Sequence, residues 1–281
     1  MRDIVIGSEA LQSGLLTRYQ LQRYHRRLLP DVYMPKDRAP SLHDRTVAAW
    51  LWSRRRAVIA GSAAAALHGA MWVDDATPVE VIWDNPRPPD GLVVRNETLA
   101  EGEITRAAGL PVTTVARTAF DLARHLPRRT ALVRLDALMR AIRFPPEDVT
   151  TLAANHRGAR GVRRLPRVLP FVDEGAASPK ETWLRLLILD AGLPAPQTQI
   201  PICDGRGFLA VLDMGWKEYR VAAEYDGDQH RSDRQQYVRD QRRARRLSEL
   251  GWLVVRVIKE DSEAEALHRI RQALLSQGWL R

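Results

Sequence analysis

The spacing of apolar and polar positions predicts helices and short strands in alternation along the chain. In the first forty residues, a turn at Gly14 precedes a helix that begins at Thr17, and a wing-like strand interrupted by Pro30 follows over residues 28–34. Residues 1–40 are therefore predicted to form a helix-turn-helix followed by a short β-ribbon.

Residues 41–150 form an α/β region without a residue cluster that indicates chemistry. The predicted elements are a helix capped by Ser62 that ends at His68, strands over 79–83 and 92–95, and helices over 114–125 and 128–142. We interpret His68 as a packed or capping residue, because no second ligand-type residue lies at helical spacing from it. A basic linker or helix over 151–175, with an acidic break at 173–177, separates this region from a domain over 176–281.

The C-terminal part combines helices with four strand-like runs. Ser178 caps a helix with Pro179 at its first position. Strands are predicted over 199–203, 208–216, 219–226 and 252–258, and helices over 233–250 and 262–277. A hairpin turn between Glu218 and Tyr219 would place Asp213 opposite Glu224, whereas a slip of one residue would separate these acids.

The predicted hairpin gathers three carboxylates on one face, since Asp226 lies two residues beyond Glu224. Like charges that oppose each other on neighbouring strands are destabilising. A hard divalent cation, Mg²⁺ or Mn²⁺, would compensate them, because it prefers oxygen ligands. The alternative is that each acid is an ordinary structural or surface group.

Composition narrows the classes of protein to which the chain can belong. The 281 residues are 45% hydrophobic and 27% charged, which suits two folded domains and excludes a largely disordered chain. A single cysteine, Cys203, excludes a zinc finger and indicates a reducing, cytoplasmic compartment. We expect no secretory signal and no membrane span. The net charge of +9 favours polyanionic partners, nucleic acid before an acidic membrane surface.

Two basic helices are candidate nucleic-acid contacts. Long arginine and glutamine side chains can each make two hydrogen bonds to a base edge in the major groove. On the first helix the predicted contacts are Arg18, Gln22, Arg23 and Arg26. The later helix, residues 231–246, carries seven arginines against two aspartates, a net charge of +5. Its predicted phosphate contacts are Arg239, Arg242, Arg243 and Arg246. For both helices the alternative is a solvated charged face.

Three segments of the first 145 residues carry a family resemblance. They are the run from Gly14 to Tyr33, the run Ser62-Ala-Ala-Ala-Ala-Leu-His-Gly69, and Pro111-Val-Thr-Thr with Arg117-Thr-Ala-Phe-Asp-Leu-Ala123. In this combination the chain resembles the AbiEi-type antitoxin family found in actinobacteria. The resemblance implies a winged-helix start that binds DNA and a regulatory or DNA-targeting role.

A second resemblance runs from Ser178 to the end of the chain. The motifs are Ser178-Pro-Lys-Glu181, Leu212-Asp213, Ala223-Glu224-Tyr-Asp226-Gly-Asp-Gln-His230, Asp240-Gln-Arg-Arg243 and Gly251-Trp-Leu-Val-Val-Arg256. In order and spacing they resemble the Vsr-like branch of the PD-(D/E)XK nuclease superfamily. The resemblance implies a restriction-endonuclease-like mixed sheet flanked by helices, so that the whole chain is of the α/β (α+β) class. It also implies metal-dependent hydrolysis of phosphodiester bonds.

This second resemblance assigns roles to individual residues. Asp213 and Glu224 would be metal ligands, with the backbone carbonyl of Tyr225 as a third. Glu181 would approach from its helix, although a glutamate three residues after a serine cap can equally complete a capping box.

The superfamily lysine expected two residues after Glu224 is replaced by Asp226. His230 is then the candidate for proton transfer, with Lys180 and Gln229 as weaker ones. A structural histidine at a helix cap or sheet edge is the alternative. The catalytic residues assigned in this way are Asp213, Glu224, Asp226, His230 and Glu181.

The sequence therefore predicts a cytoplasmic DNA endonuclease that uses Mg²⁺ or Mn²⁺ and is brought to DNA by its N-terminal region. The rival is a non-catalytic transcriptional regulator or antitoxin whose nuclease fold has lost turnover. RNA is an alternative substrate, because carboxylate-bound metal does not distinguish the two sugars. A homodimer is also left open.

Overall fold

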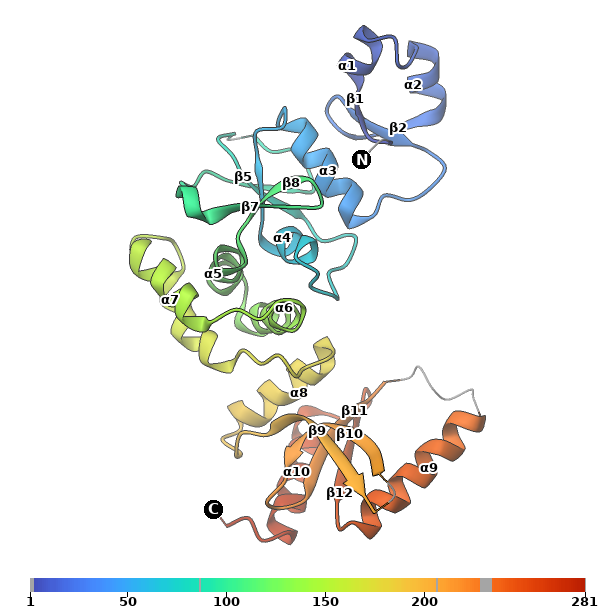
Figure 1. The fold of residues 1–281 in the computed structure, drawn as a ribbon, viewed down its shortest axis with the longest axis vertical. Coiled ribbons are helices and arrows are strands. Elements are labelled where there is room, and N and C mark those ends of the chain that lie inside the picture. Colours follow the sequence, from blue (N-terminus) through green and yellow to red (C-terminus); the bar gives the residue numbers. More distant parts are fainter. Residues whose placement is uncertain (1–2, 86, 206, 228–233, 281) are drawn as a thin grey trace. The chain divides into compact units, whose positions relative to one another are not determined.

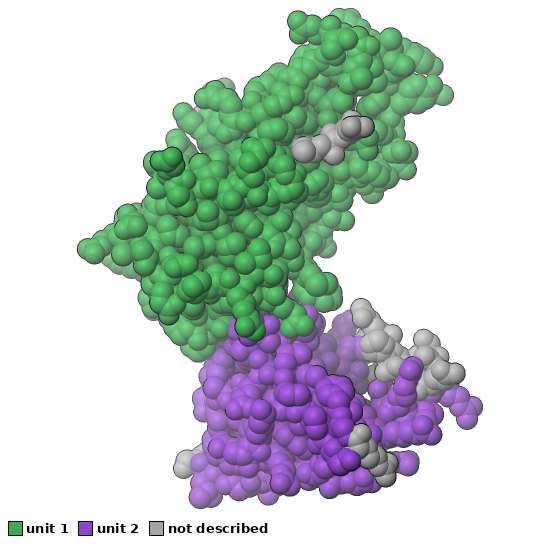
Figure 2. Space-filling view, viewed as in Figure 1, with its two compact units in different colours: residues 1–172 green, residues 173–281 purple. Residues whose placement is uncertain are grey.

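The structure is a computed structural model that describes residues 3–85, 87–205, 207–227 and 234–280, with only the backbone of 235–237. The chain divides into two compact units, residues 1–172 (unit 1) and 173–281 (unit 2), which Figure 2 colours separately. The division falls at Asp173, where the sequence carries its acidic break. Among the described residues there is no helix with the length and apolar character needed to span a bilayer.

Unit 1 begins with a small helix-turn-helix closed by a three-stranded sheet (Figure 1). Its elements are β1 (Val5–Ile6), α1 (Gly7–Gln12), α2 (Arg18–Tyr24), β2 (His25–Leu29) and β3 (Val32–Pro35), and the strand order is β1-β3-β2. Thr17 caps α2, because its hydroxyl accepts a hydrogen bond from the Gln20 backbone while the Gln20 side chain accepts one from the Thr17 backbone. The helix start that the sequence predicts at Thr17 is confirmed, with Thr17 in the cap position.

The short β-ribbon that the sequence predicts is present. The interruption at Pro30 is its turn, because the antiparallel strands β2 and β3 meet there through Pro30 and Asp31. Asp31 has a left-handed backbone, with φ of +62°. Its carboxylate accepts hydrogen bonds from the backbone and hydroxyl of Ser8, at 2.9 and 2.6 Å, which fixes the turn. Proline thus turns the chain, since it has no N–H to continue a ladder.

The rest of unit 1 is a five-stranded mixed sheet with helices packed around it (Figure 1). The helices are α3 (Leu42–Trp52), α4 (Gly61–Leu67), α5 (Val115–His125), α6 (Arg128–Ala141) and α7 (Pro146–Asn155), with short 3-10 turns η1 (Glu101–Glu103), η2 (Val162–Arg167) and η3 (Leu169–Phe171). The strands are β4 (Val58–Ala60), β5 (Val79–Ile82), β6 (Leu92–Arg95), β7 (Ile104–Ala107) and β8 (Leu110–Thr113), in the order β6-β5-β4-β8-β7. Fully buried Ile59, Val81 and Val112 are part of the core between sheet and helices.

Two details of unit 1 correct the sequence prediction. Ser62 is not the cap of α4, because the helix begins at Gly61 with Ala60 in the cap position and Ser62 is buried inside it. The basic segment after α7 packs within unit 1, where Arg164 Nη1 donates to the Arg124 carbonyl at 3.3 Å. That segment is therefore part of the first unit rather than a free linker.

In the part of unit 2 that the structure describes, a four-stranded mixed sheet is accompanied by three helices (Figure 1). Its elements are α8 (Pro179–Asp190), β9 (Gln197–Asp204), β10 (Gly207–Trp216), β11 (Val221–Asp226), α9 (Arg234–Glu249), β12 (Leu253–Ile258) and α10 (Glu263–Ser276). The strand order is β12-β11-β10-β9, with β12 parallel to β11 and the other neighbours antiparallel. Helix α9 makes the crossover between the parallel strands, as such a connection requires. The predicted α/β (α+β) class is confirmed.

The hairpin of β10 and β11 has the register that the sequence predicts. Met214 pairs with Ala223, and Trp216 pairs with Val221, so the turn is centred between Glu218 and Tyr219. Apolar side chains of α8 and α10 form one core cluster with the sheet, and Leu247 of α9 belongs to a second. Continuing the register by one residue brings Asp213 beside Glu224.

Candidate functional sites

The acidic end of the β10–β11 hairpin forms a cavity in unit 2. Asp213 is half-buried inside β10, between the buried residues Leu212 and Met214, and Glu224 is buried in β11. The cavity has a volume of about 300 Å³. It is lined by Asp213, Glu224, Tyr225, Asp226, Asp240, Arg243 and Arg256. The structure thus brings together the carboxylates that the sequence prediction placed on the hairpin.

The carboxylates of this cavity disturb one another electrostatically. Burial, followed by the nearby charges of Glu181 and Glu224, raises the pKa of Asp213 to about 7. A backbone hydrogen bond from Tyr225 and the charge of Arg243 act in the opposite direction but do not offset this. Near neutral pH the Asp213 carboxyl is therefore poised between its protonated and ionised forms.

Glu181 has both of the roles that the sequence predicts as alternatives, a cap of α8 and a charge at the acidic site. Ser178 caps α8 by accepting a hydrogen bond from the Glu181 backbone at 3.2 Å. The Glu181 carboxylate in turn accepts one from the backbone of Ala177 at 2.8 Å, one residue before the expected partner. It also lies close enough to Asp213 to raise the pKa of that carboxyl. Glu181 is therefore a capping residue that contributes charge to the acidic site.

Gln199 is a residue of this region that the sequence reasoning missed. Its side-chain Nε2 lies 3.5 Å from a Glu181 carboxylate oxygen. Its backbone is left-handed, with φ of +49°, inside strand β9. Such a conformation is costly for a residue other than glycine and tends to accompany functional sites. No local sequence pattern signals it.

The four arginines of α9 that are predicted to contact nucleic acid have two different surroundings. Arg243 and Arg246 face the sheet, where they form ion pairs with Glu224 and Asp204. Arg239 and Arg242 are exposed and line a surface hollow together with Arg234 and Val238. Of these four arginines, Arg239 and Arg242 therefore have exposed guanidinium groups that a partner could contact directly.

The carboxylates that line the cavity determine whether it could hold a divalent cation. Nowhere in the described ranges do three His, Cys, Asp or Glu side chains gather tightly enough to hold an ion by themselves. Mg²⁺, however, keeps several waters and is commonly bound through one or two carboxylates plus substrate phosphate. Asp213 and Glu224 supply two such carboxylates and a cavity open to water. These residues fit a weakly held Mg²⁺ or Mn²⁺. His230 and Gln229, the predicted proton carriers, lie outside the described residues.

Helix α2 is the candidate contact in unit 1. Of its seven residues only Leu21 is buried, and Arg18, Gln22 and Arg23 are exposed as predicted. Tyr19 and Tyr24 are also exposed, at 66% and 56%, and their rings meet edge to face. Arg26 is not on this helix, because α2 ends at Tyr24. It lies on β2 and donates a hydrogen bond to the Lys36 carbonyl at 2.7 Å.

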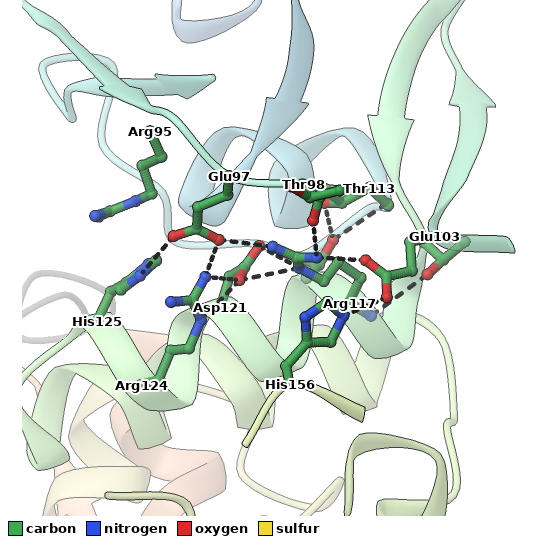
Figure 3. Close-up of polar contacts among 12 residues, drawn as sticks. Arg95, Glu97, Thr98, Glu103, Thr113, Arg117, Asp121, Arg124, His125 and His156 are labelled. Atoms are coloured by element: carbon green, nitrogen blue, oxygen red, sulfur yellow. Dashed lines mark hydrogen bonds and ion pairs between the residues drawn. The ribbon is translucent and has the colours of Figure 1, made fainter. Parts of the chain in front are cut away.

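A network of buried charges in unit 1, which the sequence reasoning did not identify, lies around α5 (Figure 3). Arg117 and Arg124 are the two largest fully buried side chains among the described residues. Arg117 contacts Glu97 at 2.7 Å and also pairs with Glu103 and Asp121. Arg124 contacts Asp121 at 2.7 Å and pairs with Glu97. The network, which we call the α5 charge network, comprises Glu97, Glu103, Arg117, Asp121, Arg124, His125 and His156.

The α5 charge network neutralises its acids internally. Burial alone would raise the pKa of Glu97, but hydrogen bonds from His125 and Arg124 outweigh it and lower the pKa to about 2. His156 lies 2.6 Å from Glu103, whose pKa is also lowered despite its burial. Burial keeps the pKa of Asp121 raised, although Arg117 and Arg124 flank it. Because both guanidinium groups are paired with acids of the network, we interpret the network as a structural brace that joins segments distant in sequence.

Comparison with known proteins identifies the central part of unit 1. A family model of the AbiEi antitoxin C-terminal domain matches residues 56–171, a range that includes the α5 motif Arg117-Thr-Ala-Phe-Asp-Leu-Ala123. The AbiEi resemblance is thereby confirmed for this region. The resemblance of residues 178–281 to Vsr-like nucleases stays a prediction.

Two curated relatives cover most of the chain. They are the uncharacterized protein MT2308 of Mycobacterium tuberculosis strain CDC 1551 / Oshkosh and the uncharacterized protein Rv2248 of strain ATCC 25618 / H37Rv. Each is 34% identical over 230 residues, which is 80% of this chain and 83% of the relative. The chain therefore belongs to the same family as these two mycobacterial proteins, and its residues 56–171 are similar to the AbiEi antitoxin C-terminal domain.

Proposed function

We propose that this protein is a DNA-binding regulator of the antitoxin type, and that α2 contacts the major groove. The observation that carries the proposal is the nearly complete exposure of α2 within a helix-turn-helix that is closed by a three-stranded sheet. The AbiEi domain in the same unit supports a regulatory role.

The chemistry of α2 suits a DNA groove. Arg18 and Arg23 offer two cations for phosphates or guanine edges, and Gln22 offers the paired donor and acceptor that adenine requires. No acidic side chain lies on α2. The nearest acid in sequence that the structure describes, Asp31, is engaged by Ser8 and Arg54. The charged side chains on α2 itself are therefore all attractive to a polyanion.

Fluorescence anisotropy with the full chain and labelled duplex DNA tests this proposal. We expect affinity to fall steeply with salt, and Arg18→Ala with Arg23→Ala to weaken binding and flatten the salt slope by about 0.9 for each phosphate contact removed. Arg106→Ala, an exposed arginine on β7, is the matched control. Equal losses in the control and the α2 variant would refute the role of α2, and absence of duplex binding would refute the proposal.

We propose as a second candidate that unit 2 hydrolyses phosphodiester bonds with a divalent cation. The specific observation is Asp213 beside Glu224 in a cavity that also contains Arg243 and Arg256. A Mg²⁺ or Mn²⁺ ion held by Asp213 and Glu224 would act as a Lewis acid on the phosphate and lower the pKa of a bound water. Exposed Arg239 and Arg242 would hold the backbone phosphates of the strand. His230 would carry the proton.

Cleavage assays separate this second candidate from a purely DNA-binding protein. Nicked, mismatched, supercoiled and single-stranded DNA, and RNA, are incubated with the full chain and Mg²⁺ or Mn²⁺. We expect Asp213→Asn and Glu224→Gln each to abolish cleavage, while Glu249→Gln, an exposed acid at the end of α9, leaves it unchanged. If the wild-type chain does not cleave, or if Asp213→Asn still does, unit 2 is a binding domain only.

A further inference from the structure

Arg243 occupies the acidic cavity in a way that the proposed hydrolysis does not explain. Its Nη2 donates to Glu224 Oε1 at 2.5 Å and to the Val211 carbonyl at 3.0 Å. Its Nη1 lies 3.5 Å from the second Glu224 oxygen. Both oxygens of this buried carboxylate therefore face one guanidinium group.

We infer that Arg243 is a built-in counter-ion that occupies the place of the divalent cation at Glu224 and must leave before the cation binds. The inference rests on the proposed hydrolysis, because it names the residue that controls access to the same site. The Arg243 guanidinium faces both oxygens of Glu224, so it lies where a divalent cation held by the same two oxygens would sit, and the two positive charges would repel each other.

The charge of the cavity explains why a counter-ion is needed. Three carboxylates of the hairpin line it (Asp213, Glu224 and Asp226) together with two guanidinium groups (Arg243 and Arg256). When all five groups are ionised, their negative charge exceeds their positive charge by one. Glu181 adds a further negative charge close to Asp213. If Arg243 moved away without replacement, Glu224 would be left buried and unpaired, which is strongly unfavourable. A divalent cation can replace Arg243 and also reduce the remaining repulsion.

The position of Arg243 allows such an exchange. It is one helical turn from Arg239, which is exposed and faces the surface hollow of α9. The Arg243 side chain is only half-buried, so its guanidinium has space to rotate toward solvent. Arg246 makes a comparable pair with Asp204, but neither residue lines the acidic cavity. Of these two paired arginines of α9, Arg243 is therefore the one that lies at the acidic cavity.

Isothermal titration of the full chain with Mn²⁺, without nucleic acid, tests this inference. We expect Arg243→Ala to bind Mn²⁺ about tenfold more tightly than the wild type, which corresponds to about 1.4 kcal/mol. Arg245→Ala, an exposed arginine of the same helix, should bind Mn²⁺ as the wild type does. Equal or weaker Mn²⁺ binding by Arg243→Ala would overturn the role of Arg243.

A second variant protects the test from a folding defect. Arg243→Gln keeps a polar side chain beside Glu224, and circular dichroism checks that both variants are folded. We expect Mn²⁺ to raise the melting temperature of Arg243→Gln more than that of the wild type, and an equal rise would contradict the inference. If Mn²⁺ binds neither wild type nor variants, the proposed hydrolysis fails as well. If it binds all of them equally, only the role of Arg243 fails.

Discussion

The two units both gather acidic side chains, but they neutralise them in different ways. In the α5 charge network, Arg117 alone pairs with Glu97, Glu103 and Asp121, and Arg124 pairs with two of the same acids (Figure 3). In the cavity of unit 2, Arg243 forms an ion pair with Glu224. The pKa of Glu97 is accordingly lowered to about 2, whereas that of Asp213 is raised to about 7.

This difference separates a structural cluster from a candidate ligand site. A buried ion cluster whose members satisfy each other has no capacity left for a ligand, and its removal costs stability. A group of acids with too few cations is unstable by itself and gains from binding one. We therefore assign the α5 charge network to the folding of unit 1 and propose the acidic cavity as the ligand site of unit 2.

The largest expected effect is in the α5 charge network. Arg117→Met should destabilise unit 1 by about 3–5 kcal/mol, because it leaves buried carboxylates without their shared counter-ion. The free energy of unfolding is measured by denaturant titration, with hydrogen exchange of α5 as the local reporter.

The matched control for Arg117→Met is Arg106→Met. Arg106 is exposed on β7, and its replacement should change the free energy of unfolding by no more than about 0.5 kcal/mol. Adding Asp121→Asn to Arg117→Met should recover part of the loss, since it removes one of the two carboxylates, Glu97 and Asp121, that Arg124 would otherwise have to neutralise. A loss of unfolding free energy below about 1 kcal/mol for Arg117→Met would show that Arg124 neutralises the network alone. The contrast between the α5 charge network and the acidic cavity would then no longer hold.

The second prediction concerns the acidic cavity and its dependence on pH. Because the pKa of Asp213 is raised in the folded chain above its ordinary value of about 3.9, protonation favours the folded state. Wild-type unit 2 should thus lose stability as pH rises from about 4 to about 7. Asp213→Asn should remove this loss and be more stable than the wild type by about 2 kcal/mol at pH 8, less than the full shift implies because the cavity admits solvent.

Hydrogen exchange of residues 207–227 in buffer with chelator measures this effect between pH 5 and pH 8. The two proteins should converge toward pH 5, and Glu249→Gln should follow the wild type throughout. A wild type as stable as Asp213→Asn at pH 8 would mean that Asp213 is not strained by its neighbours. The cavity would then resemble the α5 charge network rather than differ from it.

The fold of unit 2 was largely predictable because its signals are local. Ser178 with Pro179 marks the start of α8, and alternating apolar runs mark the strands. The β10–β11 register follows from a short connection between adjacent strands, and it places Asp213 beside Glu224. The Arg243 ion pair was not predictable, because it joins a helix residue to a strand nineteen positions earlier in the sequence.

The α5 charge network shows the opposite case. Arg117 and Asp121 have helical spacing, which the sequence displays, but their partners come from distant segments. Glu97 precedes Arg117 by twenty residues, and His156 follows Glu103 by fifty-three. No periodicity links such positions, since the folded sheet brings them together. The prediction that Arg26 lies on α2 is wrong for a related reason. Helix α2 ends at Tyr24 and β2 begins at His25, so the chain has left the helix before it reaches Arg26.

The smallest expected effect is at the edge of the α5 charge network. His156 contacts Glu103 at 2.6 Å and lies against the Phe120 ring, with 5.7 Å between ring centroids. His156→Gln should cost about 1 kcal/mol of unfolding free energy, much less than Arg117→Met, because Arg117 continues to neutralise Glu103. His268→Gln, an exposed histidine of α10, is the control in the same denaturant titration. A cost as large as that of Arg117→Met would mean that the histidine, and not the arginine, neutralises Glu103, and the brace would then depend on the protonation of an imidazole.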